Sequence, residues 1–458
     1  MKTLLKGGIV VTANGPKKAD VLIDGEKIAK VGRNLTCSDA SIVNVADQLL
    51  FPGFIDAHTH FDLDVCNTTT ADNFSTGSKA ALMGGTTTVI DYACPNKGES
   101  LQHGLDLWHT KADGYTYCDY SFHMTIDDWN ESIEKEVANM FAAGITSFKM
   151  YTTYSAMMIS DGDMYLALKK LKKFGGICGV HCENSSIIDA KISERKAAGK
   201  MGVSSHAITR PDYLEAEAVA RVLRIAQAAD APIIIVHLTS EAAMREVEIA
   251  RKRGQKVYVE TCPQYLLLDE SVYFNEDYST AARYVCAPPL RTDLDQRYLW
   301  KALRRDEIQT ISTDHCSFTL AQKDAGKEDF TKIPGGLPGV ENRGELIYSY
   351  GVATRKISLG QMCRLLSENP ARLYGLFPRK GIIRKGSDAD IVVYDPRASH
   401  VIRAEDMTAN VDYTPYEGFV TSGGISMVFL RGNLAVRNGK VVTDRCGKYL
   451  VRGKNNLG

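Results

Sequence analysis

Six residues carry imidazole, amine or carboxylate side chains that could bind a metal or transfer a proton, and they are spread over more than half of the chain. All but one directly end a short apolar run that is typical of a strand, and the remaining histidine comes two residues after another histidine. Histidine and aspartate are ordinary ligands of zinc and similar divalent ions, so the pattern predicts a metal site if these strand ends meet. The set comprises His58, His60, Lys149, His181, His237 and Asp314.

Lys149 is the unusual member of this set. An amine buried at a strand end must find a counter-ion or give up its proton. A neutral amine can react with carbon dioxide to form a carbamate, whose two oxygens can bridge two cations about 3.5–4 Å apart. An ordinary ion pair between Lys149 and a nearby carboxylate is the alternative, and the residue types leave both open.

A single buried histidine is more often structural than a metal ligand. The recurrence of such residues at strand ends and the His58-Thr59-His60 motif favour the metal site, because a structural role must otherwise be invoked separately for each. Other histidines carry no comparable signal and are expected to be structural, namely His103, His109, His123 and His400.

The elements that must position this set alternate between strands and helices. Helical periodicity is clearest over Tyr213–Ala229 and Ser240–Arg253. Eight strand–helix repeats predict an α/β fold with a (β/α)₈ barrel, in which the carboxyl ends of all strands converge on one face. An open doubly wound sheet is the alternative, but no glycine-rich phosphate loop follows the first strand. The strand runs end at Ala57-His58, Asp91-Tyr92, Phe122-His123, Lys149-Met150, Val180-His181, Val236-His237, Glu260-Thr261 and Thr313-Asp314.

Both chain ends are rich in short strands. Leu4–Ala13 is expected to be one strand, and Asp24-Gly25 is typical of a hairpin turn between two more. Asp390–Tyr394 begins a similar pattern near the other end. We therefore predict a small β-sandwich domain built from residues 1–51 and 376–458, beside a barrel of residues 52–375.

Composition narrows the class of protein. The 458 residues include 55 Lys and Arg against 55 Asp and Glu, and this zero net charge disfavours a nucleic-acid or membrane-surface binder. No run approaches the roughly 18 apolar residues of a transmembrane helix, and the N-terminus does not resemble a signal peptide. The 11 cysteines are odd in number and form no CxxC pair, which is typical of reduced thiols in a cytoplasmic protein.

Several motifs resemble the metal-site segments of the amidohydrolase superfamily, in particular its hydantoinase/dihydropyrimidinase branch and the bacterial D-hydantoinases and phenylhydantoinases. The resemblance covers essentially the whole chain, with supporting stretches at Gly84–Thr88, Glu260–Leu266, Pro288–Arg291, Pro338–Arg343 and Gly386–Asp390. The metal-site segments are Gly53–His60, Ser147–Tyr151, Val180–Asn184, Ile235–Leu238 and Thr313–Cys316.

The resemblance implies a hydrolase with two zinc ions in a (β/α)₈ barrel, accompanied by a β-sandwich from both chain ends. It also implies a homotetramer. The implied ligands are His58, His60 and Asp314 for one zinc, His181 and His237 for the other, and carboxylated Lys149 as the bridge.

The implied reaction opens a cyclic amide, such as a 5-substituted hydantoin or a dihydropyrimidine, to an N-carbamoyl amino acid. Asp314 would act as general base and then general acid, and the Tyr154 hydroxyl would stabilise the oxyanion. Two positions depart from the family pattern, because Ala287 stands where many members have Ser and Gly335 where they have Asn. In the family these positions hold the ring largely through main-chain atoms.

Two other functions are weighed against this one. A dihydroorotase or allantoinase is the enzymatic alternative, but a dihydroorotase needs an arginine fork for its substrate carboxylate, and Phe61-Asp62 follows the His-x-His motif here. A non-catalytic scaffold of the same fold is the other alternative, although such relatives have lost metal ligands that this chain keeps.

Overall fold

A barrel of eight parallel strands forms the centre of the computed structural model, which describes residues 2–456. A bridge between Thr59 and His315 brings the first and last strands together, so the sheet is nearly closed. The predicted (β/α)₈ barrel is confirmed. In sheet order the strands are β8 (Phe54–Thr59), β11 (Thr86–Ala93), β12 (Asp119–Thr125), β13 (Ser147–Tyr151), β14 (Ile177–His181), β15 (Ile233–Ile235), β16 (Val257–Thr261) and β17 (Thr310–Ile311).

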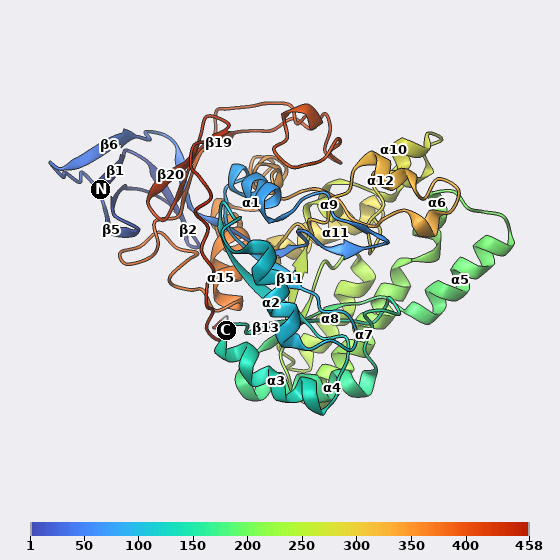
Figure 1. The fold of residues 1–458 in the computed structure, drawn as a ribbon. Helices are drawn as coiled ribbons and strands as arrows, with labels where there is room; N and C mark the ends of the chain where they lie inside the picture. Colours follow the sequence, from blue (N-terminus) through green and yellow to red (C-terminus); the bar gives the residue numbers. More distant parts are fainter. Residues whose placement is uncertain (1, 457–458) are drawn as a thin grey trace.

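Helices follow most of the strands and cover the outside of the barrel (Figure 1). The two helices expected from periodicity are present as α7 (Asp212–Ala229) and α8 (Glu241–Lys252), and the Ser240 side chain caps α8 by accepting from Ala243 N. The other longer helices are α1 (Phe74–Met83), α2 (Leu101–Ala112), α3 (Glu131–Ala142), α4 (Asp161–Phe174), α5 (Ser185–Ala197), α6 (Ser204–Thr209) and α11 (Asp293–Arg304). Short helices are α9 (Pro263–Leu267), η1 (Glu270–Phe274), α10 (Tyr278–Ala282), α12 (Leu320–Asp324), η2 (Phe330–Lys332), α13 (Arg343–Ile347), η3 (Tyr348–Val352), α14 (Leu359–Cys363), η4 (Arg364–Glu368), α15 (Asn369–Leu373) and η5 (Ala404–Asp406).

Strands from both chain ends build two further sheets beside the barrel. A four-stranded sheet has the order β5-β4-β1-β6, and a seven-stranded sheet has the order β21-β20-β19-β18-β7-β2-β3. In the larger sheet, Leu50 of β7 pairs with Val393 of β18, and a separate apolar core lies on these sheets. The strands are β1 (Lys2–Lys6), β2 (Ile9–Thr12), β3 (Gly15–Lys18), β4 (Asp20–Asp24), β5 (Lys27–Gly32), β6 (Ala40–Asn44), β7 (Leu49–Pro52), β18 (Ile391–Asp395), β19 (Gly424–Leu430), β20 (Asn433–Arg437) and β21 (Lys440–Val441). A separate two-stranded hairpin pairs β9 (Asp64–Val65) with β10 (Thr68–Thr69).

The expectation of one strand over Leu4–Ala13 is wrong. The chain leaves β1 at Gly7, whose φ of 83° lies in the left-handed region that favours glycine, and it enters the other sheet as β2. The Asp20 carboxylate accepts from Gly7 N at 2.8 Å and holds this bend. Both β1 and β2 are apolar, so the sequence pattern did not reveal that they belong to different sheets. The exact limits of the two domains stay a prediction.

A buried ion cluster joins the barrel to the strands of the C-terminal end. Lys380 Nζ lies 2.6 Å from carboxylate oxygens of Asp119 and Asp390 and 3.1 Å from Asp388. These three carboxylates lie close enough together to hold a cation, but the lysine ammonium already fills that role. The cluster is therefore an electrostatic link between the start of β12 and the strands around β18.

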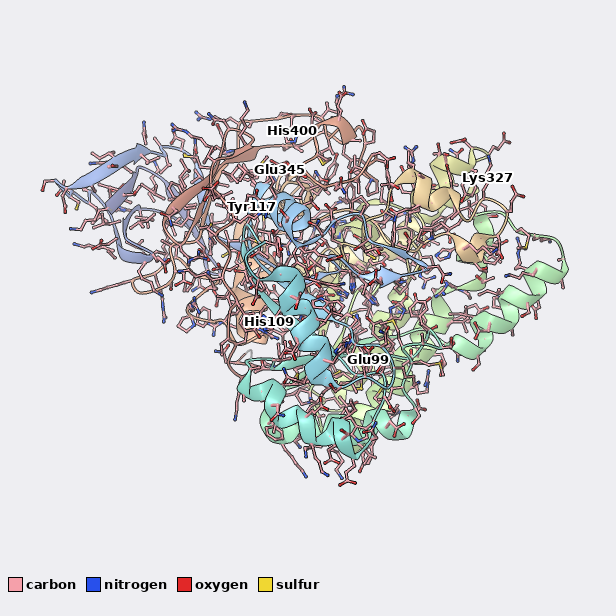
Figure 2. All side chains as sticks on the ribbon, in the orientation of Figure 1. Glu99, His109, Tyr117, Lys327, Glu345 and His400 are labelled. Carbon is pink, nitrogen blue, oxygen red and sulfur yellow. The ribbon has the colours of Figure 1, made fainter. Side chains whose placement is uncertain are left out.

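Histidines that the sequence left as structural have ordinary partners. His400 Nε2 lies 3.3 Å from Glu345 Oε2, and both residues are labelled in Figure 2. His109 Nδ1 lies 2.9 Å from Asp113 Oδ1. His123 is buried, with Nδ1 2.5 Å from the Ser147 hydroxyl. Within residues 2–456, no helix combines the length and apolar character needed to cross a bilayer.

Candidate active site

A pocket of about 420 Å³ opens where the carboxyl ends of the barrel strands converge. The strands deliver side chains from positions far apart in the chain to this one cavity, so the expected convergence of the polar residues is observed. Apolar side chains and two short main-chain segments complete its wall. The predicted ligand residues His58, His60, Lys149, His181, His237 and Asp314 all line it.

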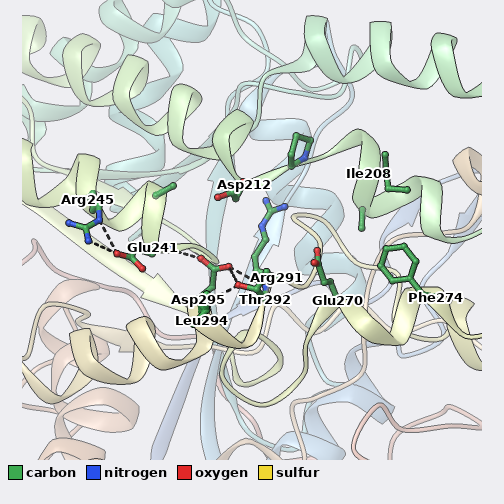
Figure 3. Close-up of a pocket in the computed structure, with 13 residues that line it drawn as sticks. Ile208, Asp212, Glu241, Arg245, Glu270, Phe274, Arg291, Thr292, Leu294 and Asp295 are labelled. Atoms are coloured by element: carbon green, nitrogen blue, oxygen red, sulfur yellow. Dashed lines mark hydrogen bonds and ion pairs between the residues drawn. The ribbon is translucent and has the colours of Figure 1, made fainter.

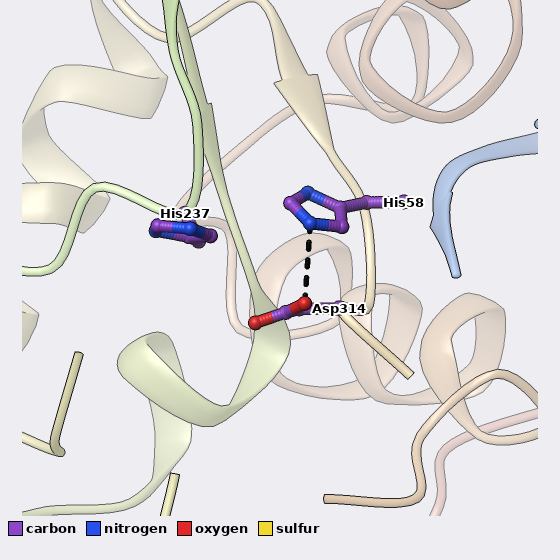
Figure 4. Close-up of side chains that lie close together, drawn as sticks. All are labelled: His58, His237 and Asp314. Atoms are coloured by element: carbon purple, nitrogen blue, oxygen red, sulfur yellow. Dashed lines mark ion pairs between the residues drawn. The ribbon is translucent and has the colours of Figure 1, made fainter. Parts of the chain in front are cut away.

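Asp314 lies at the centre of the cluster. Its Oδ1 is 3.1 Å from His58 Nε2 and 3.2 Å from His60 Nε2. Ligand atoms of His58, His237 and Asp314 all lie within 4.8 Å of one another (Figure 4). Moreover, Nδ1 of His60 and Nδ1 of His237 are buried without a hydrogen-bond partner among the described residues. The imidazoles of His58 and His237 beside the carboxylate of Asp314 form a donor set that fits a divalent cation.

Burial sets the charge state of this donor set. It lowers the pKa of both His58 and His237 well below the ordinary value, and nearby Lys149 adds to the effect. For Asp314, burial alone would raise the pKa, but His58, His60 and His237 together hold it well below its usual range. The pocket thus presents neutral imidazole nitrogens next to an anionic carboxylate, which is the protonation state that metal binding requires.

Lys149 has no ion-pair partner of the usual kind. Lys149 is 1% exposed, and its Nζ lies 3.5 Å from His58 Nε2. Among residues 2–456, no carboxylate oxygen lies within 4.0 Å of Nζ, so the simple ion pair weighed from the sequence is not formed. Burial lowers the pKa of the Lys149 amine, against the opposing charges of Asp314 and Glu260. A lysine in this environment is suited to reacting as a neutral amine.

Two buried glutamates behind the histidines were not identified from the sequence. Glu260 Oε1 lies 2.6 Å from His58 Nδ1, and Glu183 Oε2 lies 2.7 Å from His181 Nε2. Each carboxylate fixes the orientation of the ring that it contacts. A signal was present in both cases, because Glu260 sits at the end of a predicted strand and Glu183 follows His181 by two residues.

Tyr154 lies at the side of the pocket, near His181. The two ring centroids are 5.3 Å apart, and the Arg210 guanidinium lies 5.6 Å from the tyrosine ring centroid. Four non-glycine residues of the pocket have a positive φ, namely Cys66 at 54°, Tyr154 at 67°, His237 at 37° and Asp314 at 53°. Such strain in non-glycine residues is typical of sites where the surrounding structure imposes a functional geometry.

Ala287 and Gly335 lie next to each other in the pocket wall. A Cβ placed on Gly335 would lie 4.0 Å from Ala287 N, and both residues are partly exposed to the cavity. Within residues 2–456, the main-chain N–H and C=O groups of these two residues have no hydrogen-bond partner. These four groups border the cavity and have no partner within the protein, so they are available to donate to and accept from a ligand there.

Comparison with known proteins places this geometry in a family. The model of the amidohydrolase family matches residues 49–442. The chain is 40% identical to a D-hydantoinase of Geobacillus stearothermophilus, over 99% of this chain and 97% of the relative. A D-phenylhydantoinase of Escherichia coli is 41% identical, over 98% and 97%. The crystal structure of a dihydropyrimidinase from Brevibacillus agri superposes with a TM-score of 0.98 at 40% identity, covering 100% of both chains.

The chain belongs to the amidohydrolase family. The relatives place it in the hydantoinase/dihydropyrimidinase branch that its motifs resemble. Members of this superfamily generally bind divalent metals, and the His/Asp cluster of this amidohydrolase is suited to do so.

A larger hollow of about 630 Å³ lies outside this amidohydrolase pocket, between α7, α8 and α11. Four of its six charged side chains already have partners, namely Glu241, Arg245, Arg291 and Asp295 (Figure 3). Arg245 pairs with Glu241, and Asp295 accepts from Glu241 N and from the Thr292 hydroxyl. None of the clusters of possible metal ligands among the described residues lies there, so the smaller pocket is the candidate active site despite its size.

Proposed function

We propose that this chain hydrolyses a cyclic amide, a 5-substituted hydantoin or a dihydropyrimidine, to an N-carbamoyl amino acid. The observation that carries the proposal is the pair of open main-chain segments at Ala287 and Gly335 beside the His/Asp cluster. A ring amide offers both an N–H donor and a C=O acceptor, and these segments offer the complementary acceptor and donor. The names of the D-hydantoinase and dihydropyrimidinase relatives agree with this substrate class.

We also propose that the cluster holds two zinc ions. His58, His60 and Asp314 would bind one ion and His181 and His237 the other. Carboxylated Lys149 would bridge them, which its unpaired, buried amine supports. When bound, such ions supply Lewis-acid activation of water and of the substrate carbonyl.

The chain's own residues supply the proton transfers and part of the charge stabilisation. Asp314 would take a proton from the attacking water and pass it to the leaving ring nitrogen, as general base and then general acid. The Tyr154 hydroxyl would donate a hydrogen bond to the oxyanion that develops on the ring carbonyl. Burial raises the pKa of Tyr154, so its hydroxyl stays protonated and able to donate.

Apolar side chains in the pocket wall favour a substrate with an apolar ring substituent. Arg210 also lines the pocket, but Glu183 accepts from its Nη1 at 2.8 Å, so its charge is already balanced. This pairing disfavours the dihydroorotase alternative, whose substrate needs a guanidinium for its carboxylate. The apolar group comprises Leu63, Val65, Met157, Ile192, Phe330 and Ile333.

The proposed setting is a cytoplasmic homotetramer with a small-molecule substrate. The family resemblance supports the tetramer, and 11 cysteines without a disulfide among the described residues support a reducing compartment.

A panel of ring substrates tests the function. Purified protein is expected to open 5-substituted hydantoins and dihydropyrimidines, and N-carbamoyl products are measured by chromatography with both enantiomers of each hydantoin. Chelation should abolish the activity, and zinc or a similar ion should restore it. Dihydroorotate and allantoin serve as comparison substrates. A preference for either one over every hydantoin and dihydropyrimidine would contradict the proposal.

Ala287→Ser is expected to change kcat and KM for the preferred ring by less than about threefold, because a main-chain contact is indifferent to the side chain. Steady-state kinetics at constant metal content provide the measurement. A large gain or loss in a variant with unchanged thermal unfolding would show that the side chain at this position contacts the ring.

A further inference from the structure

Lys323 is a buried cation without an anion. Its side chain, on α12, is 1% exposed, and no carboxylate oxygen of residues 2–456 lies within 4.0 Å of Nζ. Instead, Nζ donates to three main-chain carbonyls, at 2.9 Å to Val285, 2.7 Å to Pro334 and 2.9 Å to Gly336. All three donors of the ammonium are therefore used. Removing a charge from water costs free energy, and apolar packing alone would not require an ammonium at this position.

The three carbonyls belong to the two segments that carry the open groups of the pocket. Pro334 and Gly336 flank Gly335, and Val285 precedes Ala287 by two residues. The Val285 carbonyl also accepts from Gly336 N at 3.0 Å, so the ammonium and this bond tie the two segments together.

The planarity of the peptide bond means that these hydrogen bonds also fix the directions of the Gly335 N–H and C=O groups. In a planar trans peptide, C=O and N–H point in opposite directions. The Pro334 carbonyl points to Lys323, so the Gly335 N–H of the same peptide points away from it. The Gly336 N–H points to Val285, so the Gly335 carbonyl of that peptide points away from Val285. Both Gly335 groups are thereby turned outward, and they are the groups without a partner inside the protein.

We propose that Lys323 is a positioning residue that holds the main chain of Gly335 and Ala287 in the geometry that binds the ring amide of the substrate. The inference rests on the proposed function and deepens it, since it assigns ring recognition to an ammonium that does not touch the substrate. Loss of the ammonium would leave the Pro334 and Gly336 carbonyls without this donor and the Val285 carbonyl with only Gly336 N, and the two segments would be free to shift.

Lys323→Met tests the proposal, because methionine fills much of the same volume without donors. We expect KM for a dihydropyrimidine to rise about tenfold, while kcat changes by less than about twofold and metal content stays constant. Tyr278→Phe is the matched control: its hydroxyl donates to the Lys323 main-chain carbonyl at 2.6 Å, so the variant loosens α12 and spares the ammonium. The control should keep the wild-type KM.

The pH dependence of KM in the wild type gives a second readout that a purely structural lysine would not produce. Burial lowers the pKa of Lys323 to about 8, and the titratable groups that act on it are the thiols of Cys286, Cys316 and Cys66. Burial raises the pKa of Cys286 to about 12 and that of Cys316 well above its ordinary value, so these two thiols stay neutral. Below pH 8 the ammonium has three donors, and above it one donor is lost. KM should therefore rise above pH 8, and this rise should be absent in Lys323→Met.

A dihydropyrimidine is used because its ring stays neutral over this range. An unchanged KM in folded Lys323→Met, or a fall confined to kcat, would overturn the proposal. If Lys323→Met does not fold, a wild-type KM that stays flat from pH 7 to above pH 9 overturns it. A wild-type protein that opens no ring substrate would instead refute the proposed function.

Discussion

Lys149→Ala is expected to lose bound metal and ring hydrolysis together, with activity falling by more than about 100-fold. The reason is that the proposed bridge is an anionic carbamate between two cations, and alanine leaves nothing in its place. Lys149→Arg should be no better, because the guanidinium stays charged and does not carry a carbamate in the same way. The measurements are metal per chain by elemental analysis and initial rates with the preferred ring.

Further measurements test the carbamate on Lys149 directly. A short carboxylic acid added with zinc to Lys149→Ala is expected to recover part of the activity by occupying the vacated position. Electron density at Lys149, or intact mass under native conditions, should show the added carboxylate in wild-type protein. An unmodified Lys149 in metal-loaded, active enzyme would refute the carbamate. Acidic mass spectrometry is unsuitable, because acid releases carbon dioxide from carbamates.

Asp314→Asn is expected to lower kcat by about 10²–10⁴-fold, the usual contribution of a general acid–base. The amide keeps the shape of the side chain but cannot take a proton from water at neutral pH. It also removes the negative charge that faces His58 and His60, so metal content should fall as well. Kinetics after reconstitution with excess zinc separate the two effects, because the loss of the base persists when the metal is restored.

Asp388→Asn is the matched control for loss of a buried carboxylate. Asp388 pairs with Lys27, Arg379 and Lys380 in the β-rich part of the chain, and it contributes nothing to the pocket. The control should lower the melting temperature and leave kcat and metal content unchanged. If Asp314→Asn retains more than about a tenth of the wild-type kcat at full metal content, Asp314 is not the proton carrier.

The barrel and the meeting of its polar strand ends were predictable because both depend on local patterns. Strand–helix alternation indicates the barrel, and barrel geometry places every residue at a strand's carboxyl end on one face. The break at Gly7 was not predictable, because β1 and β2 are both apolar and the sheet that each one joins is decided by partners far along the chain.

The ligand candidates in the site were recognisable by residue type, whereas the residues that orient them were not. Glu183 and Glu260 stand at or beside predicted strand ends, but only the fold shows that they contact the rings of His181 and His58. The role of Lys323 is still harder to predict, because its partners are main-chain carbonyls, which every residue has. The same holds for recognition by the backbone of Ala287 and Gly335, which was inferred from family resemblance and not from chemistry of their side chains.

The pairing of β7 with β18 has a consequence for synthesis on the ribosome. Leu50 emerges roughly 340 residues before its partner Val393, which corresponds to roughly 20 to 70 s at about 5–20 residues per second. During that interval β7 has an unpaired edge, and the whole barrel is translated before the edge is covered. A nascent chain that stalls between these strands would expose the unpaired N–H and C=O groups of β7 beside a nearly complete barrel. Another chain could pair with this edge and aggregate, and a chaperone that covers it would prevent this.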